Sequence, residues 1–220
     1  MVKKYSIKKT ENNCNNIADN SFWNNANTIE ITEWPWHSSD LPKPPKVTAK
    51  ALYSSTPLFI RFQVQEKYIQ AKHTELQSMV CQDSCVEFFV APINAGYYNF
   101  EVNCIGTLHL GYGKERHNRI KIEDSDLKQI NISTSLPKGI AIPSSITGPK
   151  SGYSVSYSIP FSLFEKYSNT ELPRQGTVWN ANFYKCGDLT PEPSWGAWNP
   201  VKTLQPDFHR PEFFGEIIFE

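Results

Sequence analysis

The sequence has no excess of charge of either sign and no long apolar run. Its 220 residues carry 22 Lys and Arg side chains against 22 Asp and Glu, so the formal net charge is zero. Proteins that bind nucleic acid or anionic membranes non-specifically usually carry a basic excess. No window reaches the length of a membrane span. We therefore expect neither nucleic acid nor a membrane as a partner.

Cysteine is sparse, and its number is odd. The chain has five cysteines, so at least one stays free or pairs with another chain. They are Cys14, Cys81, Cys85, Cys104 and Cys186. This usage is typical of a reducing compartment. The opening residues MVKKYSIKKTENNCNN lack the apolar segment of a secretory signal, so the sequence as given predicts a cytoplasmic protein.

Charged residues are also few, whereas aromatic residues are plentiful. Charged side chains make up 20% of the chain and Phe, Trp and Tyr 13%, a composition that excludes disorder. The 16 prolines and 11 glycines leave little room for long helices. The length suits one large domain.

Short runs of alternating apolar and polar residues predict β-strands. In the clearest run, Tyr153–Ile159, aromatic and aliphatic residues alternate with serines. The other predicted strands are Lys46–Tyr53, Leu58–Val64, Ser84–Val90, Tyr97–Cys104, Thr107–Tyr112, Leu127–Ser133, Val178–Lys185 and Phe214–Phe219. Helical signals are confined to Pro160–Tyr167 and one turn within Ala71–Ser78, and Ser135–Gly152 is typical of a loop. We expect an all-β fold: a single-domain antiparallel β-sandwich over residues 1–220, jelly-roll-like, with one or two short helices and an N-terminal extension over residues 1–19.

Three predicted strands place an unusual polar set on one face. These residues are Glu87, then Asn99, Glu101 and Asn103, then Asn180, Asn182 and Tyr184. Carboxylates and amides together supply acceptors and donors, which suits the hydroxyl groups of a sugar. The alternative is an ordinary solvated face, because antiparallel sheets commonly expose one side to water.

Four tryptophans occupy loop-like segments. Trp34 and Trp36 lie in EWPWHSSDLP, and Trp195 and Trp198 lie in PEPSWGAWNP. An indole ring stacks on the apolar face of a sugar, but Trp is also highly buried on average. Trp179 lies inside an alternating strand, so we expect it in the core.

Several segments in the same order resemble the family 9 carbohydrate-binding modules, and most closely their stand-alone branch. They are KVTAKALYSSTPLFIRFQV, QDSCVEFFVAP, YYNFEVNCIGT, TVWNANFYKCGD, WGAWNP and FHRPEFFGEIIF, and the resemblance runs from about Asn20 to the C-terminus. It implies a β-sandwich that binds chain ends of plant polysaccharides and free sugars without catalysis, in carbohydrate catabolism. It also implies structural calcium, a glycoside hydrolase as partner, and a secreted or periplasmic location.

The resemblance also implies site residues. The acidic sugar contact of the family falls on Glu87, two amide contacts on Asn103 and Asn182, and a stacking ring on Trp198. An arginine contact falls on Glu101, which reverses the charge, and a second stacking ring falls near Val80 and is missing. Trp195 and Lys185 are further candidates for contacts with a mono- or oligosaccharide.

Two other functions compete with sugar binding. Glu87 and Glu101 share a face and are candidates for the paired carboxylates of a glycoside hydrolase, either in this chain or in an enzyme to which it is an accessory subunit. The missing ring near Val80 favours instead an interaction domain that has lost sugar binding. No catalytic residue is assigned.

Metal and cofactor signals are weak. Glu123, Asp124 and Asp126 form the densest acidic run, which is usually a solvated turn, so the ligands for the implied calcium stay unknown. Cys81 and Cys85 make at most half a zinc site. We expect neither haem nor a nucleotide. The basic run Lys114–Lys121 (KERHNRIK) precedes acidic residues and predicts a solvated loop.

Overall fold

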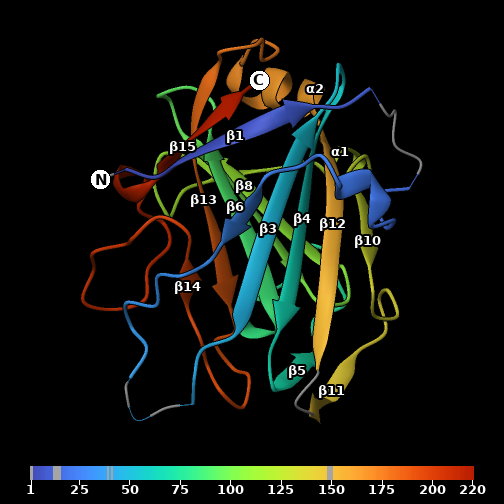
Figure 1. Ribbon diagram of the computed structural model, residues 1–220, viewed down its shortest axis with the longest axis vertical. Coiled ribbons are helices and arrows are strands. Elements are labelled where there is room, and N and C mark those ends of the chain that lie inside the picture. The colour runs from blue at the N-terminus through green and yellow to red at the C-terminus, as the bar shows by residue number, and fades with distance from the viewer. Residues whose placement is uncertain (1, 12–15, 39, 41, 148–150) are drawn as a thin grey trace.

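The computed structural model describes residues 2–11, 16–38, 40, 42–147 and 151–220, so Cys14 lies outside the described residues. Its strands form the two layers of a β-sandwich (Figure 1). One layer contains, in spatial order, β10 (Asn131–Thr134), β12 (Gly152–Pro160), β4 (Pro57–Gln65), β3 (Lys46–Tyr53) and β2 (Thr28–Glu30). The other contains β15 (Gly215–Phe219), β13 (Val178–Cys186), β6 (Cys85–Ala91), β7 (Tyr97–Asn103), β8 (Leu108–Gly113) and β9 (Ile120–Lys121). The fold is the predicted β-sandwich, and the strands within each layer pair antiparallel.

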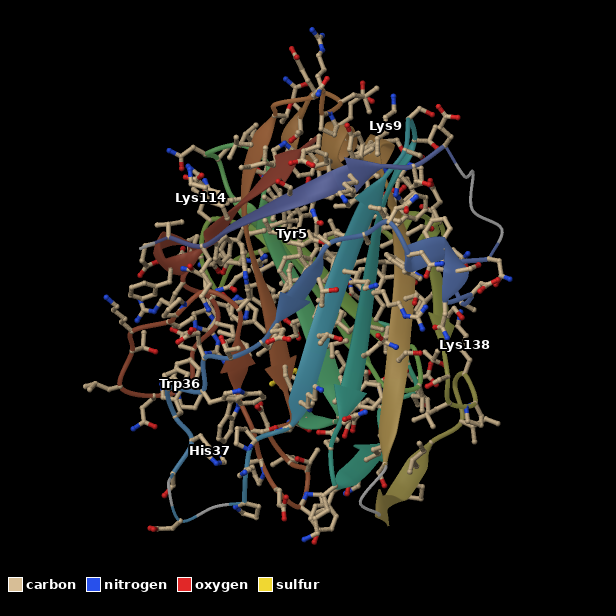
Figure 2. The ribbon with its side chains drawn as sticks, in the orientation of Figure 1. Tyr5, Lys9, Trp36, His37, Lys114 and Lys138 are labelled. Carbon is tan, nitrogen blue, oxygen red and sulfur yellow. The ribbon has the colours of Figure 1, made fainter. Side chains whose placement is uncertain are left out.

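The two layers share an edge strand, β1 (Lys4–Lys9). Its first residues pair in parallel with β15, and Lys8 and Lys9 pair in parallel with β3. Tyr5 points from β1 into the interior and is 5% exposed (Figure 2). Residues 4–9 of the segment predicted as an N-terminal extension are therefore part of the sandwich, because β1 fills a place between two strand edges and buries apolar side chains there.

The core lies between the layers and follows the predicted alternation. Phe62 and Tyr157 from one layer meet Phe88, Phe100 and Phe183 from the other, and all five are fully buried. The Phe88 and Phe183 ring centroids lie 4.9 Å apart. Trp179 is buried in the same core, as predicted.

The opposite face of the β6–β7–β13 layer is also covered. Loops from two distant parts of the chain lie over it, one following β2 and one following β14 (Gly196–Ala197) (Figure 1). They build a second apolar cluster in which the ring of Phe208 stacks on Tyr184 with centroids 4.1 Å apart. Polar side chains on this face are therefore largely removed from water.

Short elements differ most from the sequence-based predictions. Residues 135–152, predicted as a loop, contain β11 (Ile142–Thr147), which pairs with β5 (Tyr68–Ala71). Leu127, predicted to begin a strand, ends helix α1 (Asp124–Leu127). Ala71 ends a strand, and the helical turn predicted within Ala71–Ser78 is absent there. A 3-10 helix follows at Val80–Gln82. These runs are too short for their periodicity to distinguish strand, helix and loop.

In the part of the chain that the structure describes, further 3-10 helices cover Ser21–Trp23 and Pro211–Phe213. The predicted helix at Pro160 is confirmed as α2 (Phe161–Ser168). Pro160 precedes its first turn, and Asn169 ends it in a left-handed conformation. Within the described residues, the helices are too short or too polar to cross a membrane. In the same residues, Cys81, Cys85, Cys104 and Cys186 are free thiols.

Candidate functional site

A cavity of about 350 Å³ lies on the loop-covered face of the β6–β7–β8 sheet. Its floor is formed by strand residues, and its walls by the segments before β9, after β13 and before β15. The lining residues are Met79, Cys81, Glu87, Asn99, Glu101, His109, Arg116, His117, Arg119, Cys186, Asp188, Trp195, Pro206, Asp207, Phe208 and His209. Three of the predicted site residues, Glu87, Glu101 and Trp195, therefore line one cavity.

Two carboxyl groups form the centre of the floor. Glu87 on β6 lies directly opposite Glu101 on β7, and the residues are 2% and 7% exposed. Asn99 Nδ2 donates a hydrogen bond of 2.8 Å to Glu101 Oε1. Burial raises the pKa of both carboxyl groups, and the neighbouring Glu101 raises that of Glu87 further. Such a carboxyl group retains a proton more readily than an exposed one, so the pair offers donor as well as acceptor oxygens.

Arg119 lies beside this pair, although its segment was predicted to be a solvated loop. Its Nη2 donates to the carbonyl oxygen of Tyr97 and to Asn99 Oδ1, each at 2.8 Å. The guanidinium lies over the Tyr97 ring, 4.3 Å from the centroid. A methyl group at Gly111 would lie 3.1 Å from Arg119 Nε, so the glycine leaves the space that the side chain occupies.

The prediction for Lys114–Lys121 is thus wrong at one position: Arg119 turns back onto the sheet. The family resemblance predicts an arginine contact at position 101, where this chain has Glu101. Attraction between Arg119 and Glu101 raises the pKa of the arginine and lowers that of the carboxyl group, each against the larger opposing effect of burial. The structure therefore supplies a guanidinium to the same face from a different segment. Gly111 and Gly113 on β8, which leave room for the Arg119 side chain, are a sequence signal for it.

Trp195 forms part of the opposite wall. Its Nε1 donates to Asp188 Oδ1 at 2.7 Å, which fixes the ring while leaving it partly exposed. Cys186 Sγ donates to the same oxygen at 3.2 Å. The cavity therefore has one anchored indole ring next to its polar floor.

His209 closes the cavity near Tyr97. Its Nδ1 lies 2.9 Å from the Tyr97 hydroxyl oxygen. Burial, together with the nearby Arg119 and Arg116, lowers the pKa of His209 to about 3. The ring is therefore neutral at pH 7.

The structure contradicts the predicted stacking role of Trp198. The residue is 6% exposed, and its ring packs in the core against Tyr5 and Phe183. A methyl group at Gly215 would lie 2.5 Å from Trp198 Cζ3, so the ring covers the glycine closely. A buried indole has no free face for a sugar. Trp198 lies three residues after Trp195 and packs in the core between the two sheets, whereas Trp195 packs against the apolar cluster on the outer face.

Lys185 does not reach the cavity either. It pairs across strands with Val86, so its side chain points into the sandwich, where it is fully buried. Its Nζ lies 3.0 Å from Glu66 Oε2. The predicted contact with ligand at this face is wrong, because odd and even residues of β13 lie on opposite faces.

Asn103 and Asn182 lie on the predicted face but stabilise loops. Asn103 Nδ2 donates to the His73 carbonyl oxygen at 2.8 Å and to Asp83 Oδ2 at 2.9 Å. Asn182 Oδ1 accepts from the Asn199 backbone N–H at 2.9 Å, and its Nδ2 donates to the Asn199 carbonyl oxygen at 2.9 Å. Both residues are fully buried, and the N–H donors of their amides are already occupied.

The remaining loop tryptophans also hold loops in place. Trp36 Nε1 donates to the Thr203 carbonyl oxygen at 2.9 Å, and its ring contacts Phe208. The ring of Trp34 covers Gly196, where a methyl group would lie 2.6 Å from it. Neither lines the cavity.

The acidic run at α1 does not fit calcium. Lys166 Nζ lies 2.9 Å from Glu123 Oε2 and 2.7 Å from Asp126 Oδ2, so an ammonium group occupies the position between these carboxylates. Across the described ranges, no group of three or more His, Cys, Asp or Glu side chains is placed to hold a metal ion. The implied calcium stays a prediction without assigned ligands.

The fold and the cavity together define a class: a β-sandwich with a polar, indole-walled cavity on the face of one sheet. The family model described as Carbohydrate-binding family 9 matches residues 18–219, and the chain belongs to that family.

Solved structures show the same fold. A candidate carbohydrate-binding protein from Bacteroides uniformis is 28% identical, with a TM-score of 0.86 and full coverage of both chains. A family 9 carbohydrate-binding module from Caldicellulosiruptor kristjanssonii in complex with cellotriose is 14% identical, with a TM-score of 0.64, and covers 99% of this chain and 94% of its own. A family 9 module from the same organism in complex with glucose is 15% identical, with a TM-score of 0.65, and covers 99% of this chain and 96% of its own. No curated protein matches the chain.

Proposed function

We propose that this chain binds a neutral mono- or oligosaccharide in the cavity over Glu87 and Glu101. The observation that carries the proposal is the juxtaposition of two buried carboxyl groups, the Arg119 guanidinium and the anchored Trp195 ring in one cavity. Membership of the family supports it. The Caldicellulosiruptor kristjanssonii modules, which bind cellotriose and glucose, support the same ligand class.

Each group has a chemical task in this proposal. Trp195 presents a partly exposed aromatic surface to the C–H face of a sugar ring. Glu101 and Glu87 bond hydroxyl groups, and Arg119 donates to a hydroxyl or ring oxygen. A neutral ligand agrees with a cavity that mixes acidic and basic side chains and with a chain of zero net charge.

The position of the two carboxyl groups favours binding over hydrolysis. Paired carboxylates in glycosidases flank the bond that is cleaved. Glu87 and Glu101 instead lie side by side on adjacent strands, on the same floor. Both therefore approach a ligand from the same side.

The test is a glycan array followed by calorimetry on wild type and two variants, Trp195→Ala and Glu101→Gln. We expect one sugar class to bind wild type and both variants to lose at least about tenfold in affinity, or about 1.4 kcal/mol. If all three proteins bind the sugar equally well, the sugar does not bind in this cavity. If no sugar on the array binds wild type, the proposed function itself is wrong and an interaction domain is favoured.

A further inference from the structure

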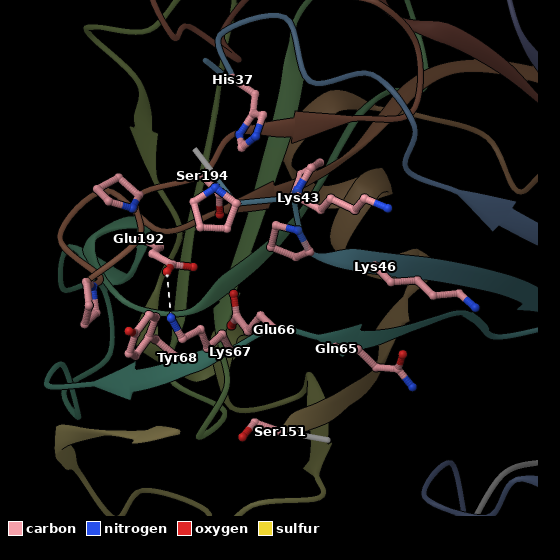
Figure 3. Close-up of a pocket in the computed structure, with 15 residues that line it drawn as sticks. His37, Lys43, Lys46, Gln65, Glu66, Lys67, Tyr68, Ser151, Glu192 and Ser194 are labelled. Atoms are coloured by element: carbon pink, nitrogen blue, oxygen red, sulfur yellow. Dashed lines mark hydrogen bonds and ion pairs between the residues drawn. The ribbon is translucent and has the colours of Figure 1, made fainter. Parts of the chain in front are cut away.

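A second and larger cavity, of about 450 Å³, lies near the end of the sandwich where β4 finishes (Figure 3). It is bounded by residues 42–46, 65–68 and 191–194, with His37 at one side. Its described lining residues are all different from those of the first cavity. The segment after β13 separates the two, because Trp195 lines the first cavity and Ser194 the second.

Two polar atoms at this cavity are buried and lack partners. Glu66 Oε1 and Ser194 Oγ make no hydrogen bond within the described part of the chain. The Glu66 side chain is 7% exposed and Ser194 is 5% exposed. A buried polar group without a partner costs about 1–3 kcal/mol, so such groups are rare unless a water molecule or ligand satisfies them.

The position of the Glu66 carboxylate is fixed from within the core. Lys185 Nζ lies 3.0 Å from Glu66 Oε2 and donates to the Cys186 carbonyl oxygen at 2.6 Å. One carboxylate oxygen is thereby bound to a buried ammonium group. The other, Oε1, has no hydrogen-bond partner within the described residues. Figure 3 shows Glu66 among the side chains that line the cavity.

The charges around the cavity are largely balanced. Lys185 compensates Glu66, and Lys67 Nζ lies 3.3 Å from Glu192 Oε1 (Figure 3). Lys43 and Lys46 stand on the exposed rim, where solvent and salt screen them. The interior therefore favours neither a free cation nor an anion.

The walls are mainly apolar and stiff. Five prolines line the cavity together with the ring of Tyr68. These prolines are Pro42, Pro44, Pro45, Pro191 and Pro193. Small-molecule sites typically combine such apolar walls with a few fixed polar groups, in volumes of about 300–1,000 Å³. A ligand that fits has an apolar C–H surface and at least one O–H donor.

We propose that this cavity is a second binding site, for a small neutral polyhydroxylated ligand such as one or two sugar rings, with Glu66 and Ser194 as its polar contacts. A ligand hydroxyl donates to Glu66 Oε1, and a second hydroxyl bonds Ser194 Oγ. The site goes beyond the proposed function, since it uses different residues and would bind independently of the cavity over Glu87 and Glu101.

The test is an amide NMR titration of the full chain with glucose and, separately, with cellotriose. We expect the backbone amides of residues 66–68 and 194 to shift on their own saturation curve, including in the Trp195→Ala variant. Ser194→Leu fills the cavity and should abolish these shifts, whereas Ser162→Leu, at an exposed position on α2, should leave them unchanged. Ser194→Ala, which removes only the hydroxyl, should weaken binding by up to about tenfold. Raising the salt concentration should leave the affinity within about twofold, since the ligand is neutral.

Two outcomes would overturn the proposal. One is the absence of shifts at residues 66–68 and 194 with either sugar, and the other is the same shifts in wild type and Ser194→Leu. If Ser194→Leu does not fold, unchanged affinity in Ser194→Ala overturns the hydroxyl contact in the same way. Failure of the first site is seen separately, as an absence of shifts at Gly111 and Arg119.

Discussion

Lys185 and Glu66 form an ion pair inside the sandwich, with 3.0 Å between Nζ and Oε2 and both side chains nearly excluded from water. The pair joins β13 in one layer to the residue that follows β4 in the other. Glu66 also lines the larger cavity, so loss of the ion pair should change the lining of that cavity.

Removing one member of this pair should be strongly destabilising. Lys185→Met leaves Glu66 buried without its counter-charge, and we expect a loss of about 3–5 kcal/mol in the free energy of unfolding. The double variant Lys185→Met/Glu66→Met should recover most of that loss, since two apolar side chains replace two buried charges. Urea denaturation of the three proteins measures both effects, and an undiminished loss in the double variant would contradict the explanation.

Trp195 and Trp198 should respond differently to truncation. Trp198→Ala creates a core cavity between Tyr5 and Phe183 and should lower the free energy of unfolding by about 3–5 kcal/mol. Trp195→Ala should cost less stability, because this ring is partly exposed, and should reduce sugar affinity. Thermal unfolding and calorimetry on both variants separate the two roles. The assignment fails if Trp198→Ala leaves the unfolding midpoint unchanged.

The buried carboxyl pair should give stability a characteristic pH dependence. Burial raises the pKa of Glu87 and Glu101 in the folded state, so the folded chain holds these protons more tightly than the unfolded chain. Their contribution to the free energy of unfolding is therefore largest in acid. It decreases as the pH rises from about 4.3, the pKa of Glu in the unfolded chain, through the raised pKa of the folded chain. Glu87→Gln should reduce this decrease, whereas Glu75→Gln, at an exposed position, should not. The measurement is the urea midpoint of each protein between about pH 4 and pH 8. If the midpoints of Glu87→Gln and wild type change in parallel with pH, the carboxyl pair is not the cause of the decrease.

The space above Gly111 should be needed for sugar binding. Gly111→Ala places a methyl group 3.1 Å from Arg119 Nε and 3.2 Å from Asn99 Oδ1, so the guanidinium must move although the charge is unchanged. We expect about a tenfold loss of sugar affinity, or about 1.4 kcal/mol. Arg119→Met should produce a similar loss, and the double variant little more, because both changes act on one contact. Additive losses would show that Gly111 acts independently of Arg119.

Alternation along the strands was sufficient to predict the sandwich and much of its core. It correctly placed Phe88 and Phe100 inside and Glu87 and Glu101 together on the opposite face. It did not identify β1. Tyr5 and Ile7 become core residues only because β1 pairs with the edges of β3 and β15, which lie far away in the sequence. Two-residue β14 is likewise too short for any period to show that Trp195 and Trp198 project to different sides.

The sequence by itself therefore determined the fold class and the face on which polar side chains gather, because a period of two residues assigns each strand residue to a face. Only the tertiary structure decided which of those side chains reach a cavity. Loops after β2 and after β14 cover the face. The segment after β5 occupies the amide of Asn103, and the loop after β14 occupies that of Asn182. Arg119 enters from a segment that looks exposed in sequence. The burial and pairing of each polar group depend on contacts between residues far apart in the chain, and local patterns do not record those contacts.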